Sequence, residues 1–214
     1  MNNRRQFSDE QLDFFEEIMN IGAGNAATAL SQILGEDVDL KIPEVHFLTA
    51  TKVASVLGLP DSPFVCVRIG MVGDVRGDLF LFVPDEHKRA LIQVAERAAG
   101  LVSPEQKTPQ STADISALTE IGNILAGVYL TAIHDFCRLN IYHTVPVIAI
   151  DMAQALLDES IISLARQVRE LILVKNEFTV RDYRMDAYLL MVPIPQSVKV
   201  FVDAIKQARA EFEK

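Results

Sequence analysis

The sequence predicts an α+β protein that forms one pseudo-two-fold domain, with an antiparallel sheet of about six strands and two long helices on one face. Three observations predict this class. Two long stretches have helical periodicity, each is followed by a strand and a hairpin pattern, and the two halves share a motif. One half would form a three-stranded sheet with open edges, so we expect the halves to join. Residues 1–214 then form one domain from two repeats, about 8–100 and 112–214.

The shared motif is the clearest sign of an internal repeat. Its residues recur at one offset of 103 positions without a gap, which is hard to obtain by chance. The pairs are Glu17 and Glu120, Asn20 and Asn123, Gly24 and Gly127, and Pro43 and Pro146. The two halves differ at most other surface positions, so we infer that these residues share a function.

Helical geometry predicts which way the motif residues face. At about 100° per residue, Asp13, Glu17, Asn20 and Gly24 fall on one narrow stripe. The apolar side chains of the same stretch fall on the opposite side. In the second copy the stripe consists of Ser116, Glu120, Asn123 and Gly127. We therefore expect both helices to bury one face and to present Glu and Asn outward.

A solvated surface is the ordinary interpretation of an exposed Glu and Asn. Asn and Gly in mid-helix each cost roughly 0.5–1 kcal/mol relative to Ala, however. The glycine on the stripe also leaves room for another molecule to approach. These features favour a functional surface.

The first half reads as helix, strand, hairpin and helix. Ser8 and Gln11 form a capping box, and the helix is expected to reach about Leu34, where Gly35 ends it. Pro43 is expected at an edge or a bulge of the first strand. The remaining elements are expected at Asp37–His46, Phe64–Met71, Asp78–Val83 and Glu86–Ala99.

The second half begins after a linker at 101–110 and follows the same order with one departure. Its long helix is expected from Thr112 to about Leu139. The departure is Asp151–Gln167, whose spacing is helical. The other elements are expected at Ile141–Ile150, Leu171–Val180, Met185–Val192 and Gln196–Lys214.

Composition limits the classes of partner and compartment. The net charge of −9 argues against nucleic acid or an anionic membrane as the main partner. No apolar run approaches the ~18–20 residues of a membrane span, and the N-terminal sequence is not a signal peptide. Cys66 and Cys137 lie in apolar patterns and read as reduced core residues. We expect a cytoplasmic protein, for which a monomer suffices.

The sequence lacks the usual catalytic constellations. It has no phosphate-binding glycine loop, no histidine spacing typical of a metal site and no partner for a serine nucleophile. An outward carboxylate and carboxamide one turn apart remain, and they occur twice. An Asn can accept a hydrogen bond from water and donate one to it, and a Glu can pair with a partner's Lys. This arrangement suits positioning a water in another protein's active site, as phosphoryl transfer requires.

The pattern Asp/Ser-x3-Glu-x2-Asn-x22-Pro resembles the CheC/CheX/FliY family of chemotaxis phosphatases, over nearly the whole chain. In the first copy it comprises Asp13, Glu17, Asn20 and Pro43, and in the second Ser116, Glu120, Asn123 and Pro146. The resemblance implies hydrolysis of the aspartyl phosphate on a CheY-type response regulator. Glu17 and Glu120 would dock on the regulator's Lys, and Asn20 and Asn123 would orient the attacking water. The protein would need no cofactor of its own, because Mg²⁺ would belong to the regulator.

Some family members also bind the receptor deamidase CheD. By resemblance the contact would be the helical segment from Asp151, with Gln154 between alanines as an imitation of a deamidation site. An ordinary amphipathic helix is an equally good interpretation. Two alternatives to a phosphatase remain: a binding module like the structural parts of the flagellar switch, which lack the Glu/Asn pairs, and a regulator that mainly sequesters CheD. A phosphatase for small phosphate esters fits least, because no metal site or basic residue accompanies the motif.

Overall fold

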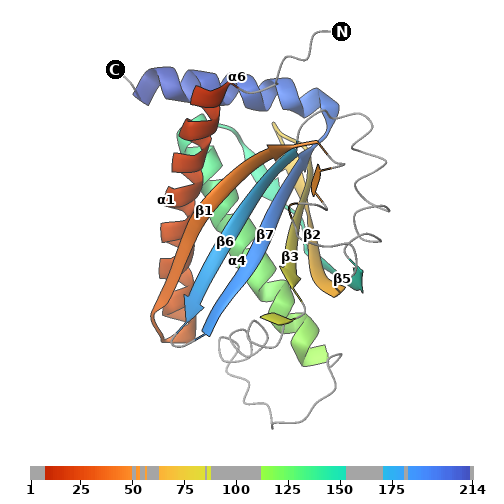
Figure 1. Cartoon of the computed structure of the whole chain (residues 1–214). Helices are drawn as coiled ribbons and strands as arrows, with labels where there is room; N and C mark the ends of the chain where they lie inside the picture. Colours follow the sequence, from red (N-terminus) through yellow and green to blue (C-terminus); the bar gives the residue numbers. More distant parts are fainter. Residues whose placement is uncertain are drawn as a thin grey trace.

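The computed structural model describes residues 8–49, 52–53, 56, 63–84, 86–87, 112–152, 171–180 and 183–212. A curved antiparallel sheet forms its centre, and α1 (Asp9–Leu34) and α4 (Thr112–Cys137) cover one face in opposite directions. A third helix, α6 (Pro195–Phe212), crosses one end of the sheet near the start of α1 (Figure 1). This is the predicted α+β arrangement, with the two long helices on one face.

Local signals fix the ends of α1 where the sequence predicts them. The Ser8 hydroxyl accepts a hydrogen bond from the Gln11 backbone N–H, and the Gln11 side chain accepts one from the Ser8 N–H. At the other end Gly35 adopts the left-handed conformation, with φ of 65°, and its N–H donates to the Ser31 carbonyl. At each end of α1, backbone groups that the helix itself leaves unpaired thus form hydrogen bonds with residues close in sequence.

The described part of the chain contains a seven-stranded sheet in the order β1-β6-β7-β3-β2-β4, with β5 also paired to β2. All of its pairings are antiparallel. The strands are β1 (Val38–Leu48), β2 (Pro63–Gly73), β3 (Gly77–Pro84), β4 (Ile141–His143), β5 (Val147–Met152), β6 (Leu171–Val180) and β7 (Tyr183–Pro193).

The strand order shows that the two halves exchange their first strands. The hairpins β2-β3 and β6-β7 meet at the centre, where β3 pairs with β7. Strand β1 of the first half pairs with β6 of the second, and β4 and β5 of the second pair with β2 of the first. Each half therefore supplies the outer strand for the hairpin of the other.

Proline interrupts the outer strand in both halves. The β1-β6 register shifts between Lys41 and Glu44, on either side of Pro43. In the second half the corresponding stretch divides into β4 and β5, with Pro146 directly before β5. Proline lacks the N–H that a ladder requires, so it sits at a bulge or an edge, as predicted for Pro43.

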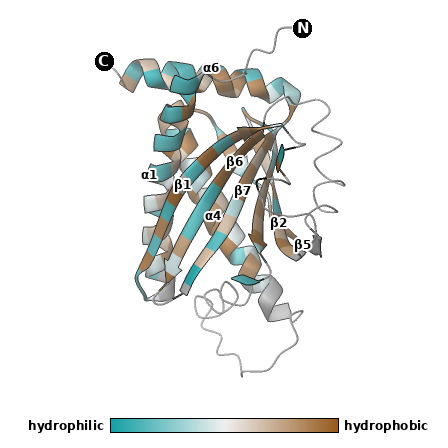
Figure 2. Ribbon diagram, viewed as in Figure 1, coloured by the Kyte–Doolittle hydropathy of each residue, from teal (hydrophilic) through white to brown (hydrophobic). Residues whose placement is uncertain are grey.

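The sheet has a hydrophobic core on both faces. Val65, Val67 and Ile69 of β2 belong to the core under α1 and α4, whereas Phe64 and Cys66 belong to a second cluster on the far face. Val53 and Val198 also join that second cluster. Strand β2 is accordingly hydrophobic along most of its length, whereas β1 and parts of β6 and β7 carry polar residues (Figure 2). The second cluster was not predicted, although uninterrupted apolar runs are typical of strands buried on both faces.

Two predicted boundaries are wrong. Helix α4 ends at Cys137 rather than near Leu139, because Arg138 adopts a left-handed φ of 54°. Asp151 was expected to begin a helix, but it lies in β5 and pairs with Phe64, so the strand extends to Met152. Residues 153–170 lie outside the described residues, as do most of the helix expected at 86–99 and the linker at 101–110. No helix in the described part is both long and apolar enough to cross a membrane.

Candidate functional site

Helix α1 presents the first copy of the motif to solvent. Asp13, Glu17, Asn20 and Gly24 are all exposed, as their spacing predicts. The opposite side of the helix is anchored in the core by Phe15, Ile18, Met19, Ala23 and Ala26. Burial of this face fixes the rotation of α1, and hence the direction in which the motif residues face.

Helix α4 presents the second copy in a slightly more enclosed setting. Ser116 and Glu120 are exposed, whereas Asn123 and Gly127 are half-buried. Leu118, Ile121 and Leu125 hold the opposite side in the core. The two copies therefore have the same order along a helix but different surroundings.

The Glu and Asn side chains of the motif are free to bind another molecule. Within the described part of the chain, Glu17, Asn20, Glu120 and Asn123 make no hydrogen bond or ion pair through their side chains. Each carboxylate can accept an ion pair from a partner, and each carboxamide can both donate to a water and accept from it.

The glycines near the motif divide into two kinds. A Cβ on Gly22 would lie 3.0 Å from the Tyr129 ring, and one on Gly122 would lie 2.8 Å from Val67, so close packing accounts for both. A Cβ on Gly24 would meet nothing within 4 Å. Gly24 therefore costs helix stability without a packing reason among the described residues.

The second motif glycine has one neighbour that the sequence did not reveal. A Cβ on Gly127 would lie 3.5 Å from Nε2 of His143, a residue of β4. No partner for His143 was predicted from the sequence, because its nearness to α4 depends on how β4 packs in the sheet. A histidine three residues before the repeat proline, Pro146, was the signal available.

The prolines of the motif belong to the outer strands and not to the helices that carry the Glu and Asn residues. Pro146 is buried, and Pro43 marks the register shift in β1. Strand β1 packs against α1, and β4 and β5 pack against α4. The prolines therefore shape the strand on which each motif helix rests.

The predicted CheD contact is only partly described. Asp151 lies in the outer strand β5, opposite Phe64, and Gln154 lies outside the described residues. The structure thus places the Asp151 backbone at the sheet edge and not at the start of a helix.

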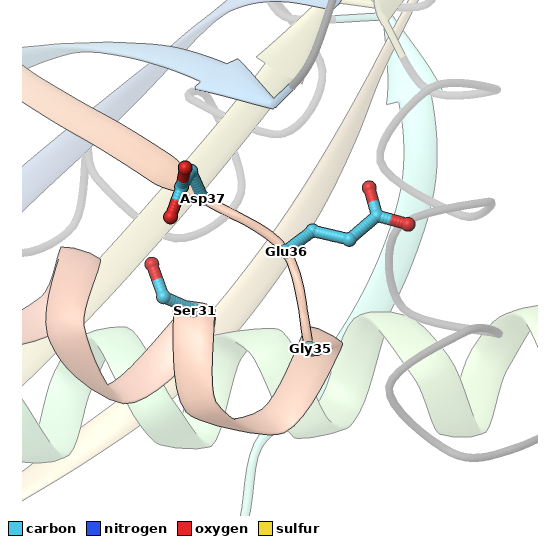
Figure 3. Close-up of a pocket in the computed structure, with 4 residues that line it drawn as sticks. All are labelled: Ser31, Gly35, Glu36 and Asp37. Atoms are coloured by element: carbon cyan, nitrogen blue, oxygen red, sulfur yellow. The ribbon is translucent and has the colours of Figure 1, made fainter.

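Neither of two surface pockets contains the motif. One lies beyond the C-terminal end of α1 and is lined by Ser31, Gly35, Glu36 and Asp37 (Figure 3). The Asp37 and Ser31 side chains point toward each other there, and Glu36 points away. Two carboxylates at one pocket oppose binding of a phosphate. The other pocket lies between the end of α4 and α6.

Other candidate chemistry is absent from the described residues. They contain no group of three or more His, Cys, Asp or Glu side chains placed to hold a metal ion. Cys66 and Cys137 are buried, and burial raises the pKa of each thiol to about 12. Neither cysteine is therefore a thiolate nucleophile at neutral pH.

The matches to known proteins fall on the motif. Residues 10–46 and 115–150 match the CheC-like family, so both Glu/Asn copies and both prolines lie in the matched segments. The chain is 30% identical to the CheY-P phosphatase CheC of Bacillus subtilis (strain 168) over 197 residues. These residues cover 91% of this chain and 93% of that protein.

Solved structures share the architecture. FliY from Thermotoga maritima superposes with a TM-score of 0.70 and 21% identity, covering 94% of this chain and 98% of that one. The FliM middle domain from H. pylori superposes with a TM-score of 0.66 and 16% identity, covering 92% and 99%. At such identities the likeness concerns the fold alone. From the identity to the B. subtilis protein over nearly all of both chains, we conclude that this chain belongs to the CheC-like family.

Proposed function

We propose that this protein is a phosphatase that hydrolyses the aspartyl phosphate of a CheY-type response regulator in chemotaxis. The observation that carries the proposal is the double Glu/Asn motif, whose side chains are free of partners in the described part of the chain. The relative from B. subtilis is named as a phosphatase of phosphorylated CheY, which supports the same substrate class. Since the regulator is a cytoplasmic protein, we propose a cytoplasmic location for this protein too.

In the proposed mechanism, each stripe completes the regulator's own active site. Glu17 or Glu120 pairs with a Lys of the regulator and sets the position of the helix. The carboxamide of Asn20 or Asn123, one turn along, hydrogen-bonds a water and holds it in line with phosphorus. Positioning is the main contribution, because a phosphoryl transition state needs alignment and charge stabilisation rather than a strong base. The Mg²⁺ that neutralises the phosphoryl oxygens belongs to the regulator.

Gly24 supports this docking mode. It lies one turn beyond Asn20 on the exposed stripe and has open space beside it. The regulator's surface can approach the helix backbone there more closely than any side chain would permit.

The decisive experiment measures phosphate loss from a phosphorylated CheY-type regulator with wild type, Asn20→Ala, Asn123→Ala and the double variant. We expect the double variant to lose on the order of 10²-fold or more, the scale for removing a group that organises the transition state. Each single variant then reports the turnover of the other site. Circular dichroism and thermal unfolding of all four proteins control for the fold, since both asparagines lie on the solvent side of their helices.

A double variant that hydrolyses as fast as wild type would overturn the water-positioning role of the asparagines. The protein would then be a binding regulator, and CheD would be the first partner to test. In that case Asp151→Ala should weaken CheD binding, whereas Asn20→Ala and Asn123→Ala should leave it unchanged.

A further inference from the structure

The two copies of the motif differ in what lies beside their glycine. The space next to Gly24 is empty to 4 Å, whereas Nε2 of His143 lies 3.5 Å from the place of a Cβ on Gly127. Gly127 is one helical turn from Asn123, on the same stripe. Among the described residues, an imidazole nitrogen therefore flanks the second site and not the first.

The sheet register explains why His143 reaches α4. His143 pairs with Met71 of β2, and Met71 belongs to the core beneath the helices. Directly paired residues on antiparallel strands point to the same face, so the imidazole lies on the face that α4 covers. It remains exposed there.

Several hydrogen bonds hold His143 in place. The next residue, Thr144, donates its N–H to the Gly70 carbonyl at 2.9 Å, and its hydroxyl accepts from the Gly70 N–H at 2.9 Å. Nδ1 of His143 lies 3.3 Å from the Thr144 carbonyl oxygen. A carbonyl can only accept, so Nδ1 is the donor in this contact, and the tautomer with its proton on Nδ1 presents Nε2 as an acceptor.

The first copy has no counterpart to this group. The residue of β1 that corresponds to His143 at the repeat offset is Leu40, which is buried in the core under the helices. The Glu and Asn are shared by the two sites, but the acceptor beside them is not. The difference therefore concerns recognition of the partner rather than the shared chemistry.

We propose that His143 is a specificity-determining residue of the second site, and that its Nε2 accepts a hydrogen bond from an N–H or O–H group beside the regulator's phosphorylated aspartate. This inference rests on the proposed phosphatase function. It predicts that the two sites differ in their order of preference among regulators. Only the second site binds more tightly to a regulator that has a hydrogen-bond donor opposite His143.

The test isolates each site before changing His143. In the Asn20→Ala background, where the second site works alone, His143→Ala should raise KM for the phosphorylated regulator about three- to tenfold, the worth of one hydrogen bond, with kcat little changed. His143→Gln keeps an acceptor and should recover part of the loss. In the Asn123→Ala background the second site is inactive, so His143→Ala should leave KM for the phosphorylated regulator unchanged. Tyr142→Ala is the matched control, since Tyr142 pairs with Val72 and is exposed on the other face of the same strand.

An equal change of KM in both backgrounds would mean a structural role and would overturn the proposal, as would no change in the Asn20→Ala background. The Asn20→Ala protein could have no turnover. The Kd of a beryllofluoride-loaded regulator is then measured for the Glu17→Ala protein, with and without His143→Ala. An unchanged Kd overturns the role of His143. Failure of the proposed function is a separate result, because it shows as full activity in the Asn20→Ala/Asn123→Ala protein.

Discussion

A methyl group on Gly24 would lie in open space, whereas one on Gly22, two residues earlier, would press on Tyr129 and Ala132. Both glycines lie in the same helix, so they have the same helix propensity and differ only in what surrounds them. The comparison separates a glycine needed for packing from one needed for access. It also gives a pair of substitutions with opposite expected effects on stability.

We predict that Gly24→Ala stabilises the fold by about 0.5–1 kcal/mol, because alanine favours the helix and meets no clash. In the Asn123→Ala background, where the first site acts alone, the same change should lower kcat/KM about tenfold or more, because it displaces the docked regulator. Thermal unfolding and dephosphorylation kinetics measure the two effects. Gly22→Ala is the control and should lower stability. A Gly24→Ala protein with unchanged kcat/KM would contradict close approach at this position.

At the scale of the element, α1 is held by contacts at its ends and along one face. The Gln11 side chain takes part in the capping box and also donates to the Val202 carbonyl of α6 at 3.3 Å. The Phe14 and Phe212 rings are in contact at a tilted angle of 57°, and Arg209 pairs with Glu10. The start of α1 is therefore fixed to α6, while its exposed stripe remains available.

We predict that Ser8→Ala lowers the free energy of unfolding by about 1 kcal/mol, the usual loss for an N-cap. The dephosphorylation rate should stay the same, because Asn20 lies about three turns further along the helix. Chemical denaturation gives the first quantity and the regulator assay gives the second. Thr28→Ala serves as a control on the same helix, since Thr28 bonds back to the Gly24 carbonyl and makes no cap. A Ser8→Ala protein that is fully stable but inactive would show that the cap acts on the site.

The elements that could be predicted are those whose ends and orientation depend on residues close in sequence. The bounds of α1 follow from Ser8, Gln11 and Gly35, which act on their own neighbours, and the exposed stripe follows from helical spacing. The extension of β5 through Asp151 was not predictable in this way. Its residues suit a helix, and pairing with Phe64, far away in sequence, determined the strand. The position of His143 next to Gly127 likewise depends on tertiary packing.

At the scale of the whole molecule, the exchanged outer strands tie the halves together. Strand β1 has its partner in β6 and β5 has its partner in β2. The sequence predicted a joint sheet from the open edges of each half, but it could not predict which strands would cross. Strand pairing depends on contacts between distant residues, such as Val45 with Val174, that no local pattern reveals.

We predict that neither half folds alone. Separate fragments 1–105 and 106–214 should each lack a cooperative unfolding transition, because each hairpin would lose its outer strand. Mixing the fragments should restore both the transition and the phosphatase activity. Circular dichroism during thermal unfolding and the regulator assay measure the outcome. A cooperative transition in either fragment by itself would show that the exchange is dispensable.

The exchange also sets the order of events on the ribosome. Strand β6 begins at Leu171, and β1 ends at Leu48. At about 5–20 residues per second, roughly ten seconds of synthesis separate the two strands. During that time β1 has an unpaired edge, and its charged side chains, Asp39, Lys41 and Glu44, discourage pairing with neighbouring nascent chains. Helix α1 rests on β1, so even the first site, which lies in the half that is synthesised first, is completed only when the second half has emerged.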